Sequence, residues 1–263
     1  MYRLFQHEWK MNWKSLLIWL VCVSGLCLFC ILLFDSIKES MDGMAEMMAS
    51  MGAFASAFGM DRLSISTLEG FYATEVGTIH SLGGAMFAAL LGSALLSKEE
   101  EGHTGEFLFS LPISRTKTVT AKWLALVCNI VLFNIISVLL YRLGIYILGE
   151  EIAEKRFWMY HLLQLVLHVQ IGSICFCISA YNRKNKIGVG LGITFFLYVW
   201  DLLARVVPAL EDYLYLSPFA YANASDIFST GEAEKMAVLA GVVVVMITYV
   251  VAVFVYNRKD LVV

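Results

Sequence analysis

Charged residues are scarce in this chain. Only 16% of its 263 residues are charged, 59% are hydrophobic, and the mean hydropathy is +0.73. An ordinary soluble domain is about half apolar and about a quarter charged. The shortage of charge therefore excludes a soluble enzyme, a disordered tail and a disulfide scaffold. Only three prolines interrupt the chain, as expected for a protein made mostly of long helices.

The chain also lacks a nucleotide-binding signature. None of its 19 glycines is followed by Lys, so it has no Gly-Lys-Ser or Gly-Lys-Thr to hold phosphates. The run Gly188-Val-Gly190-Leu-Gly192 has neither the preceding strand nor the second x-x-Gly step of a dinucleotide fingerprint. The net charge of −3 does not indicate a nucleic-acid partner. We expect no cofactor bound by this chain.

What the chain does contain is long apolar runs. A membrane-spanning helix needs about 20 mostly apolar residues, because the hydrocarbon layer is about 30 Å thick. Six runs meet this requirement: Ser15–Phe34, Gly77–Ser97, Ala121–Leu148, Met159–Ala180, Ile187–Val207 and Met236–Tyr256. The sequence thus predicts an all-α membrane protein with a single transmembrane domain over residues 1–263. All six cysteines lie within these runs, where we expect free thiols.

The distribution of charge between the loops predicts the orientation. With the N-terminus placed in the cytoplasm, the inner segments carry a net charge of +6 and the outer segments −9. Lys and Arg are enriched in cytoplasmic loops. We therefore predict that both termini are cytoplasmic.

Two segments outside the spans are predicted to be amphipathic helices. Residues 1–14 mix aromatic and basic side chains, which favours either a short helix in the inner headgroup region or a simple anchor for the first span. In the outer segment 35–76, apolar residues from Met41 to Phe58 recur at steps of three and four. We predict one external helix there, lying on the outer surface or on a partner chain. A soft Cu(I) site made by its methionines is the weaker interpretation.

The cytoplasmic loop 98–120 carries the most specific motif. It begins with three glutamates, continues with an apolar stretch, and ends at Pro112 and Arg115. A short apolar-faced helix between two spans either rests on the membrane or inserts into a groove on a soluble partner. Composition alone leaves both uses open.

A resemblance distinguishes the two uses. The loop contains Glu99, Gly102, Thr104, Glu106, Leu108, Ser110, Pro112, Ser114 and Arg115, with Lys122 following. This pattern resembles the second cytoplasmic segment of ABC-2 type transporter permeases. The Leu-Ser-Pro-Phe string within 214–231 is similar to a segment that many members carry before their last span. The six-span layout matches as well.

The resemblance implies a coupling helix that docks on a separate ATP-binding subunit, which would hold ATP and Mg²⁺. The docking contact would be made by Glu99, Gly102, Thr104, Glu106, Phe107, Leu108, Phe109, Pro112, Ser114 and Arg115. It further implies a permease, not itself an enzyme, that we expect to be an exporter in a prokaryotic plasma membrane. Two such chains, identical or paired with a sister permease, would assemble with two ATPases.

Small residues mark predicted helix interfaces. Ser81, Ala85, Ala89 and Gly92 lie at four-residue or similar steps along span two, and Gly188 and Gly192 form a GxxxG pair in span five. Small residues let helices approach closely in lipid. This indicates either routine packing or an interface at the transport path, and the family's second and fifth spans line that path.

Polar residues within the spans are predicted to be structural pairs. Asp201 and Arg205 lie four apart on one helix face, which favours an ion pair over a gate, and Arg142 is interpreted in the same way. His161 and His168 share a stripe with Gln164, but a third strong ligand for a metal is missing. We expect interhelical hydrogen bonds there and no metal.

Two other functions stay open. One is a non-transporting assembly or immunity protein on the same scaffold. The other is an intramembrane enzyme, which would need a nucleophile and a base facing each other. The sequence shows no such set, because the neighbours His80 and Ser81 point to different helix faces.

Overall fold

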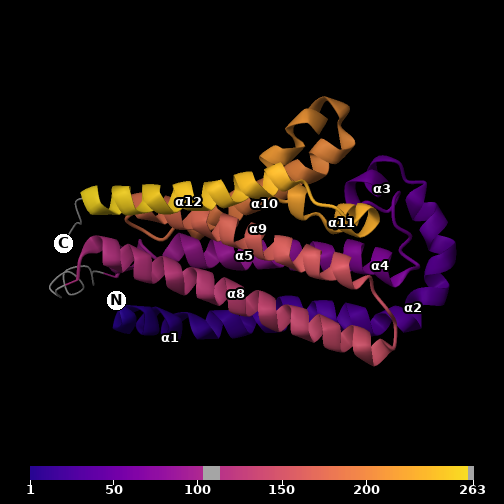
Figure 1. The fold of residues 1–263 in the computed structure, drawn as a ribbon, viewed down its shortest axis with the longest axis horizontal. Helices are drawn as coiled ribbons and strands as arrows, with labels where there is room; N and C mark the ends of the chain where they lie inside the picture. The colour runs from indigo at the N-terminus through magenta and orange to yellow at the C-terminus, as the bar shows by residue number, and fades with distance from the viewer. Residues whose placement is uncertain (103–112, 260–263) are drawn as a thin grey trace.

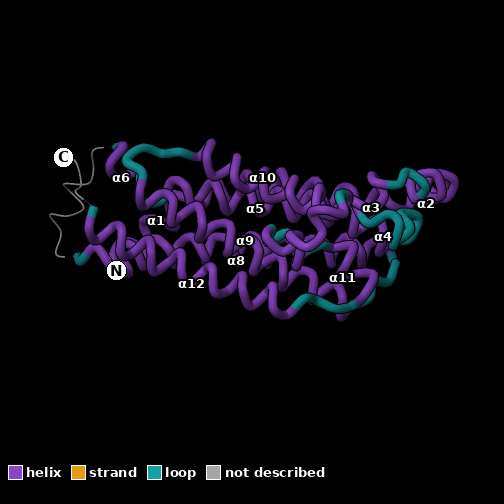
Figure 2. The backbone as a smooth tube through the Cα atoms, turned by 90° about the horizontal axis from the view of Figure 1, so that it is seen from above, coloured by secondary structure: helices purple, strands orange, loops and turns teal. Residues whose placement is uncertain are grey.

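A computed structural model describes residues 1–102 and 113–259, except for the side chains at positions 39 and 42. The described part of the chain is helical and contains no strand. Long helices run roughly parallel along one axis, and most loops gather near the two ends (Figure 1 and Figure 2). The start of α1 and the end of α12 lie at the same end, which we call the terminal end; the other is the distal end (Figure 1).

The first half of the described chain contains eight helical segments. They are α1 (Tyr2–Trp19), the π-helical η1 (Leu20–Ser24), α2 (Gly25–Ala49), α3 (Ala53–Phe58), α4 (Leu68–Phe71), the π-helical η2 (Tyr72–Val76), α5 (Gly77–Ala94) and α6 (Lys98–Glu101). The second half contains α8 (Arg115–Leu148), α9 (Glu154–Tyr181), α10 (Ile187–Val206), the 3₁₀ segments η3 (Pro208–Leu216) and η4 (Ala220–Ala222), α11 (Ala224–Thr230) and α12 (Lys235–Arg258).

The predicted fold class is confirmed. Among the described residues, six helices are long and apolar enough to cross a membrane: Tyr2–Lys38, Leu68–Ala94, Arg115–Leu148, Glu154–Tyr181, Ile187–Val206 and Lys235–Arg258. Each overlaps one of the six predicted spans. The length and the apolar composition of these helices therefore identify the chain as a multi-pass membrane protein.

Packing divides these helices into central and peripheral ones. Helices α5 and α9 lie side by side along the core, where the backbones approach closely: a Cβ added at Gly92 would lie 2.4 Å from the carbonyl oxygen of Gly172. By contrast, α10 and α12 expose large apolar side chains such as Phe196 and Ile247. Apolar surface of this kind suits lipid or another helix in the membrane.

The N-terminal segment is continuous with the first span. Residues 2–49 form one uninterrupted helical run through α1, η1 and α2, and the place of the first 14 residues in the headgroup region stays a prediction. Glu8, in the middle of these 14 residues, is completely buried. The segment therefore packs against the bundle over part of its surface.

The prediction of one external helix across Met41–Phe58 is wrong. Met41 and Met48 lie in the last turns of α2, which ends at Ala49, and Phe58 ends the separate helix α3. Gly52 separates the two helices with a φ of 53°, a left-handed value that a helix interior does not accommodate. The apolar pattern in the sequence continues across this segment, although the backbone helix is interrupted at Gly52.

Candidate functional site: the terminal end around the loop 98–120

The loop 98–120 is described only at its two ends. Thr104, Glu106, Phe107, Leu108, Phe109 and Pro112, all predicted to contact the ATPase, lie outside the described residues. Glu99 is in α6, Gly102 caps its C-terminus, and Ser114 caps α8 by accepting a hydrogen bond from the amide of Lys117 (3.4 Å). Arg115 begins α8. The structure thus shows how the loop is anchored at both ends.

Four charged side chains on three helices form the anchor, which we call the terminal ion cluster: Glu8, Lys98, Glu99 and Lys122. The Lys122 ammonium donates to Oε1 of Glu8 and to Oε1 of Glu99, both at 2.7 Å. Lys98 donates to the other oxygen of Glu8. The side chains of Glu8 and Lys122 are both 0% exposed. Buried charges are tolerated only when they are paired, so each member depends on the others.

The remaining residues of α6 connect to the other helices at this end. Glu100 forms an ion pair with Lys259, which also donates to the carbonyl of Asn182 at the end of α9 (2.7 Å). Glu101 accepts a hydrogen bond from the amide of Asn185 (3.0 Å). One turn of helix therefore contacts α1, α8, the loop after α9 and the end of α12.

Arg115, at the exit of the loop, holds the end of α12. Its guanidinium donates to the carbonyl oxygens of Tyr256 (3.3 Å), Asn257 (3.3 Å) and Lys259 (2.6 Å). The last carbonyls of a helix have no partners within it and carry partial negative charge, so a guanidinium is well matched to them. A displacement of the loop would act on the last span through this contact.

The small residues of span two lie inside the chain's own core. Ala85 and Ala89 are 0% exposed, and Ser81 and Gly92 are also buried, on the part of α5 that packs on α9. Their proposed place on a transport path stays a prediction. The neighbouring Gly84 is equally tight, because a Cβ there would lie 2.2 Å from the His168 ring.

The three glycines of span five differ in their surroundings within the chain. Cβ atoms added at Gly188 and Gly192 would meet no described atom within 4 Å, whereas one at Gly190 would lie 2.1 Å from Oγ of Ser93. The close approach to span two is therefore made by Gly190. The Gly188 and Gly192 face is open, and its proposed contact requires another chain.

The polar stripe on α9 forms hydrogen bonds to four other elements, including α5, where His168 contacts the carbonyl of Ser81 (3.2 Å). The Nε2 of His161 lies 2.7 Å from the hydroxyl of Tyr72, and Gln164 donates to the carbonyl of Ala222 (2.7 Å). His168 is 3.1 Å from the amide oxygen of Asn134. No group of three or more His, Cys, Asp or Glu able to hold a metal occurs among the residues the structure describes.

A second charge cluster lies at the distal end, and we call Arg62, Asp201, Arg205 and Asp226 the distal ion cluster. Arg205 donates to both oxygens of Asp201 (3.1 and 3.0 Å) and to Asp226 (2.7 Å), while Arg62 also pairs with Asp226. Asp201 and Arg205 are thus paired. Arg142, in span three, forms an ion pair with Glu154 at 2.6 Å.

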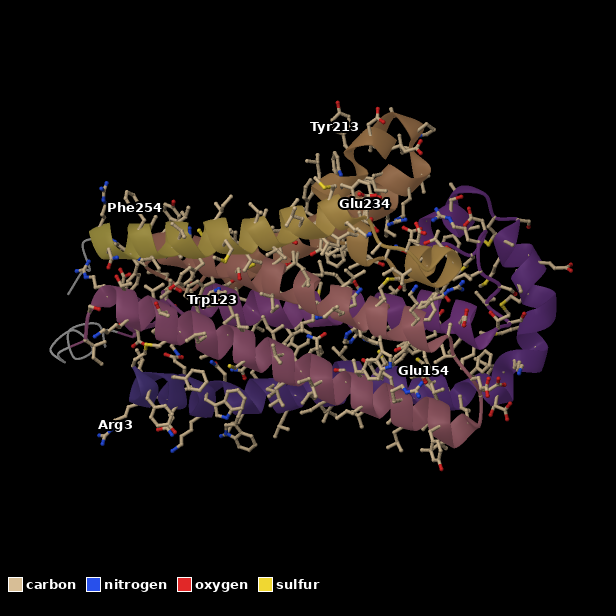
Figure 3. The ribbon with its side chains drawn as sticks, viewed as in Figure 1. Arg3, Trp123, Glu154, Tyr213, Glu234 and Phe254 are labelled. Atoms are coloured by element: carbon tan, nitrogen blue, oxygen red, sulfur yellow. The ribbon has the colours of Figure 1, made fainter. Side chains whose placement is uncertain are left out.

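The distal ion cluster borders a cavity of about 490 Å³. Its walls come from the end of α10, η3, α11 and the residues before α12, and η3 projects sideways from the bundle with Tyr213 near its tip (Figure 3). Burial, followed by repulsion from Glu234 and Asp226, raises the pKa of the Tyr215 phenol in this wall. Such a phenol is a hydrogen-bond donor at neutral pH.

The sequence indicates only part of the terminal ion cluster. Lys122 and Glu99 belong to the loop motif, whereas Glu8 does not. The sequence does contain a feature that indicates a separate role for Glu8. It is the only carboxylate among the first 34 residues and lies on the helix side opposite to the basic residues.

Comparison with known proteins agrees with these features. A family model described as "ABC-2 family transporter protein" matches residues 2–261, nearly the whole chain. No curated protein sequence matches the chain significantly. The six apolar helices and this match lead to one conclusion: the chain belongs to the ABC-2 family of transporter proteins, as the membrane-spanning permease component.

Proposed function

We propose that this permease docks its ATP-binding subunit through the loop 98–115 and exports a substrate across a prokaryotic plasma membrane. Family membership implies a separate ATP-binding subunit. The observation that carries the docking proposal is the anchoring of α6. Its four residues contact helices from both ends of the chain, so a force applied to this loop reaches α1, α8 and α12 together.

The proposed mechanism is alternating access by a dimer of permease chains. ATP binding would draw the two ATPases together, and the docked loops would move with them. Ligands can shift such an equilibrium only through different contacts in the two states. Here the contacts that differ would be those of α6 and Arg115, since both lie between the docking loop and the spans.

Docking is tested by replacing Phe107 and Phe109 with Asp. Charges at an apolar contact cost several kcal/mol when buried without a partner. We expect the variant to insert normally but to lose the ATP-binding subunit that co-purifies with the wild-type chain, together with permease-stimulated ATP hydrolysis. Tyr181→Asp, an exposed aromatic at the same end, serves as the control. Unchanged co-purification of the Phe107 and Phe109 variant would contradict docking through this loop.

The orientation is tested separately by cysteine labelling. Met47→Cys lies on exposed α2 surface at the distal end, and Lys184→Cys lies in the exposed loop after α9 at the terminal end. A membrane-impermeant maleimide should label the first variant in intact cells and the second only after permeabilisation. The reverse pattern would place both termini outside and would exclude contact of loop 98–115 with a cytoplasmic ATPase.

A further inference from the structure

The start of α1 separates its charges between two sides of the helix. Arg3, His7, Lys10 and Lys14 follow one another at steps of four, three and four, so they form a single stripe. All four are exposed. Glu8, roughly 130° away around the helix at 100° per residue, is completely buried in the terminal ion cluster. The helix therefore turns its only carboxylate inward and its basic groups outward.

The outward charge is not neutralised by any ion pair in the described part of the chain. None of Arg3, Lys10 and Lys14 forms an ion pair with another residue in the described ranges, although Glu8 is close to them in sequence. Arg3 points away from the bundle (Figure 3). A basic stripe on a helix that continues directly into a membrane span meets the headgroup region, where anionic lipids attract it.

An apolar groove runs beside this stripe, between α1 and α8. Its volume is about 390 Å³, and it is lined by Tyr2, Phe5, Gln6, Trp9, Lys10 and Cys128. The rings of Phe5 and Trp9 are stacked with centroids 6.3 Å apart, and Gln6 donates to the hydroxyl of Tyr2 (2.8 Å). The groove thus has aromatic walls and a single ammonium group, that of Lys10.

We propose that this groove binds an anionic phospholipid, with an acyl chain against Phe5, Trp9 and Cys128 and the phosphate beside Lys10. Charge complementarity identifies the occupant, because α1 exposes Arg3 and Lys14 beside the groove while its only carboxylate, that of Glu8, is buried. A zwitterionic lipid would contact the same apolar walls. It would gain much less electrostatic binding free energy from the basic stripe. The site is independent of the proposed ATPase docking; only the leaflet, the inner one, follows from the proposed orientation.

The test measures retention of phosphatidylglycerol and phosphatidylcholine by the purified full-length permease, using native mass spectrometry after exchange into detergent with each lipid. We expect tighter retention of phosphatidylglycerol, weakened about fivefold by Lys10→Gln, as for the loss of one basic residue near an anionic surface. Lys184→Gln, which removes an exposed lysine at the same end but away from the groove, is the matched control and should retain the lipid.

A second measurement locates the acyl chain. Phosphatidylglycerol brominated on its acyl chain should quench part of the tryptophan fluorescence, and Trp9→Phe should remove that part while keeping the aromatic wall. Equal retention of the two lipids by the wild type, or an equal loss in Lys10→Gln and Lys184→Gln, would overturn the proposal. Quenching that is unchanged in Trp9→Phe would equally overturn this groove as the site.

Discussion

The two ion clusters of this protein have the same charge composition but different construction. Each joins two cations to two carboxylates, one cluster at the terminal end and one at the distal end. In the terminal ion cluster Glu8 and Lys122 are 0% exposed, and their bond joins residues 114 positions apart. In the distal ion cluster the central bond joins Asp201 to Arg205, four residues apart on one helix, and Arg62 is 40% exposed.

The difference lies in the central pair of each cluster, because the distal ion cluster also contains a long-range pair, Arg62 with Asp226, 164 residues apart. A pair within one helix forms as soon as the helix forms, and its bidentate geometry suits an Arg guanidinium. The terminal ion cluster exists only when α1, α6 and α8 are assembled. It should therefore respond to movement of the loop 98–120, whereas the Asp201–Arg205 pair of the distal ion cluster should remain intact.

The largest loss in the free energy of unfolding is expected for Lys122→Met. The substitution roughly keeps the side-chain volume but removes the cation shared by the buried carboxylate of Glu8 and the half-buried carboxylate of Glu99, which should cost about 3–5 kcal/mol. The measurement is thermal unfolding of the purified permease followed by circular dichroism. Lys117→Met, exposed in the first turn of the same helix, should unfold like the wild type. An unfolding temperature unchanged in Lys122→Met would show that this lysine does not hold the terminal ion cluster.

An intermediate effect is expected for Asp201→Asn. Arg205 loses one charged partner but keeps Asp226, and the new amide oxygen can still accept one hydrogen bond. We expect a cost of about 1.5–3 kcal/mol, the range for hydrogen bonds to charged groups. The same unfolding assay applies, with Glu211→Gln on the exposed η3 as the control. A loss larger than that of Lys122→Met would reverse the ranking of the two ion clusters.

The smallest effect is expected for Arg62→Gln. The guanidinium is partly exposed and pairs with Asp226, which retains Arg205 as a partner. Exposed ion pairs contribute about 0–1 kcal/mol, and salt screens them. The difference in unfolding temperature between Arg62→Gln and the wild type should be small and should shrink further at high salt. A difference that grows with salt would mean that Arg62 acts by packing and not by charge.

The same contrast explains what the sequence could predict. The six spans follow from length and hydropathy, and the pairing of Asp201 with Arg205 follows from their spacing on one helix. Glu8 has partners 90 and 114 residues away, and no local pattern indicates contacts over such distances. The loop motif identified Lys122 through a resemblance, but that resemblance did not give its partners.

The remaining differences between prediction and structure have local causes. The periodicity from Met41 to Phe58 predicted one helix because side-chain pattern does not report backbone conformation, and Gly52 breaks the helix. In span five the spacing of Gly188 and Gly192 did not indicate the contact made within the chain, which Gly190 makes with Ser93. The rotation of a peripheral helix about its own axis decides which of its faces meets the core. Three glycines at alternate positions do not determine that rotation.

The length of helix α8, which no proline interrupts, has a mechanical consequence. The helix runs from Arg115, at the exit of the loop, to Leu148 at the distal end. At 1.5 Å per residue its 34 residues form a rod about 50 Å long, well beyond the thickness of a bilayer core. A tilt of about 5° applied at one end would displace the other by roughly 4 Å. The helix can thus work as a lever that converts a small rotation at one membrane surface into a stroke at the other.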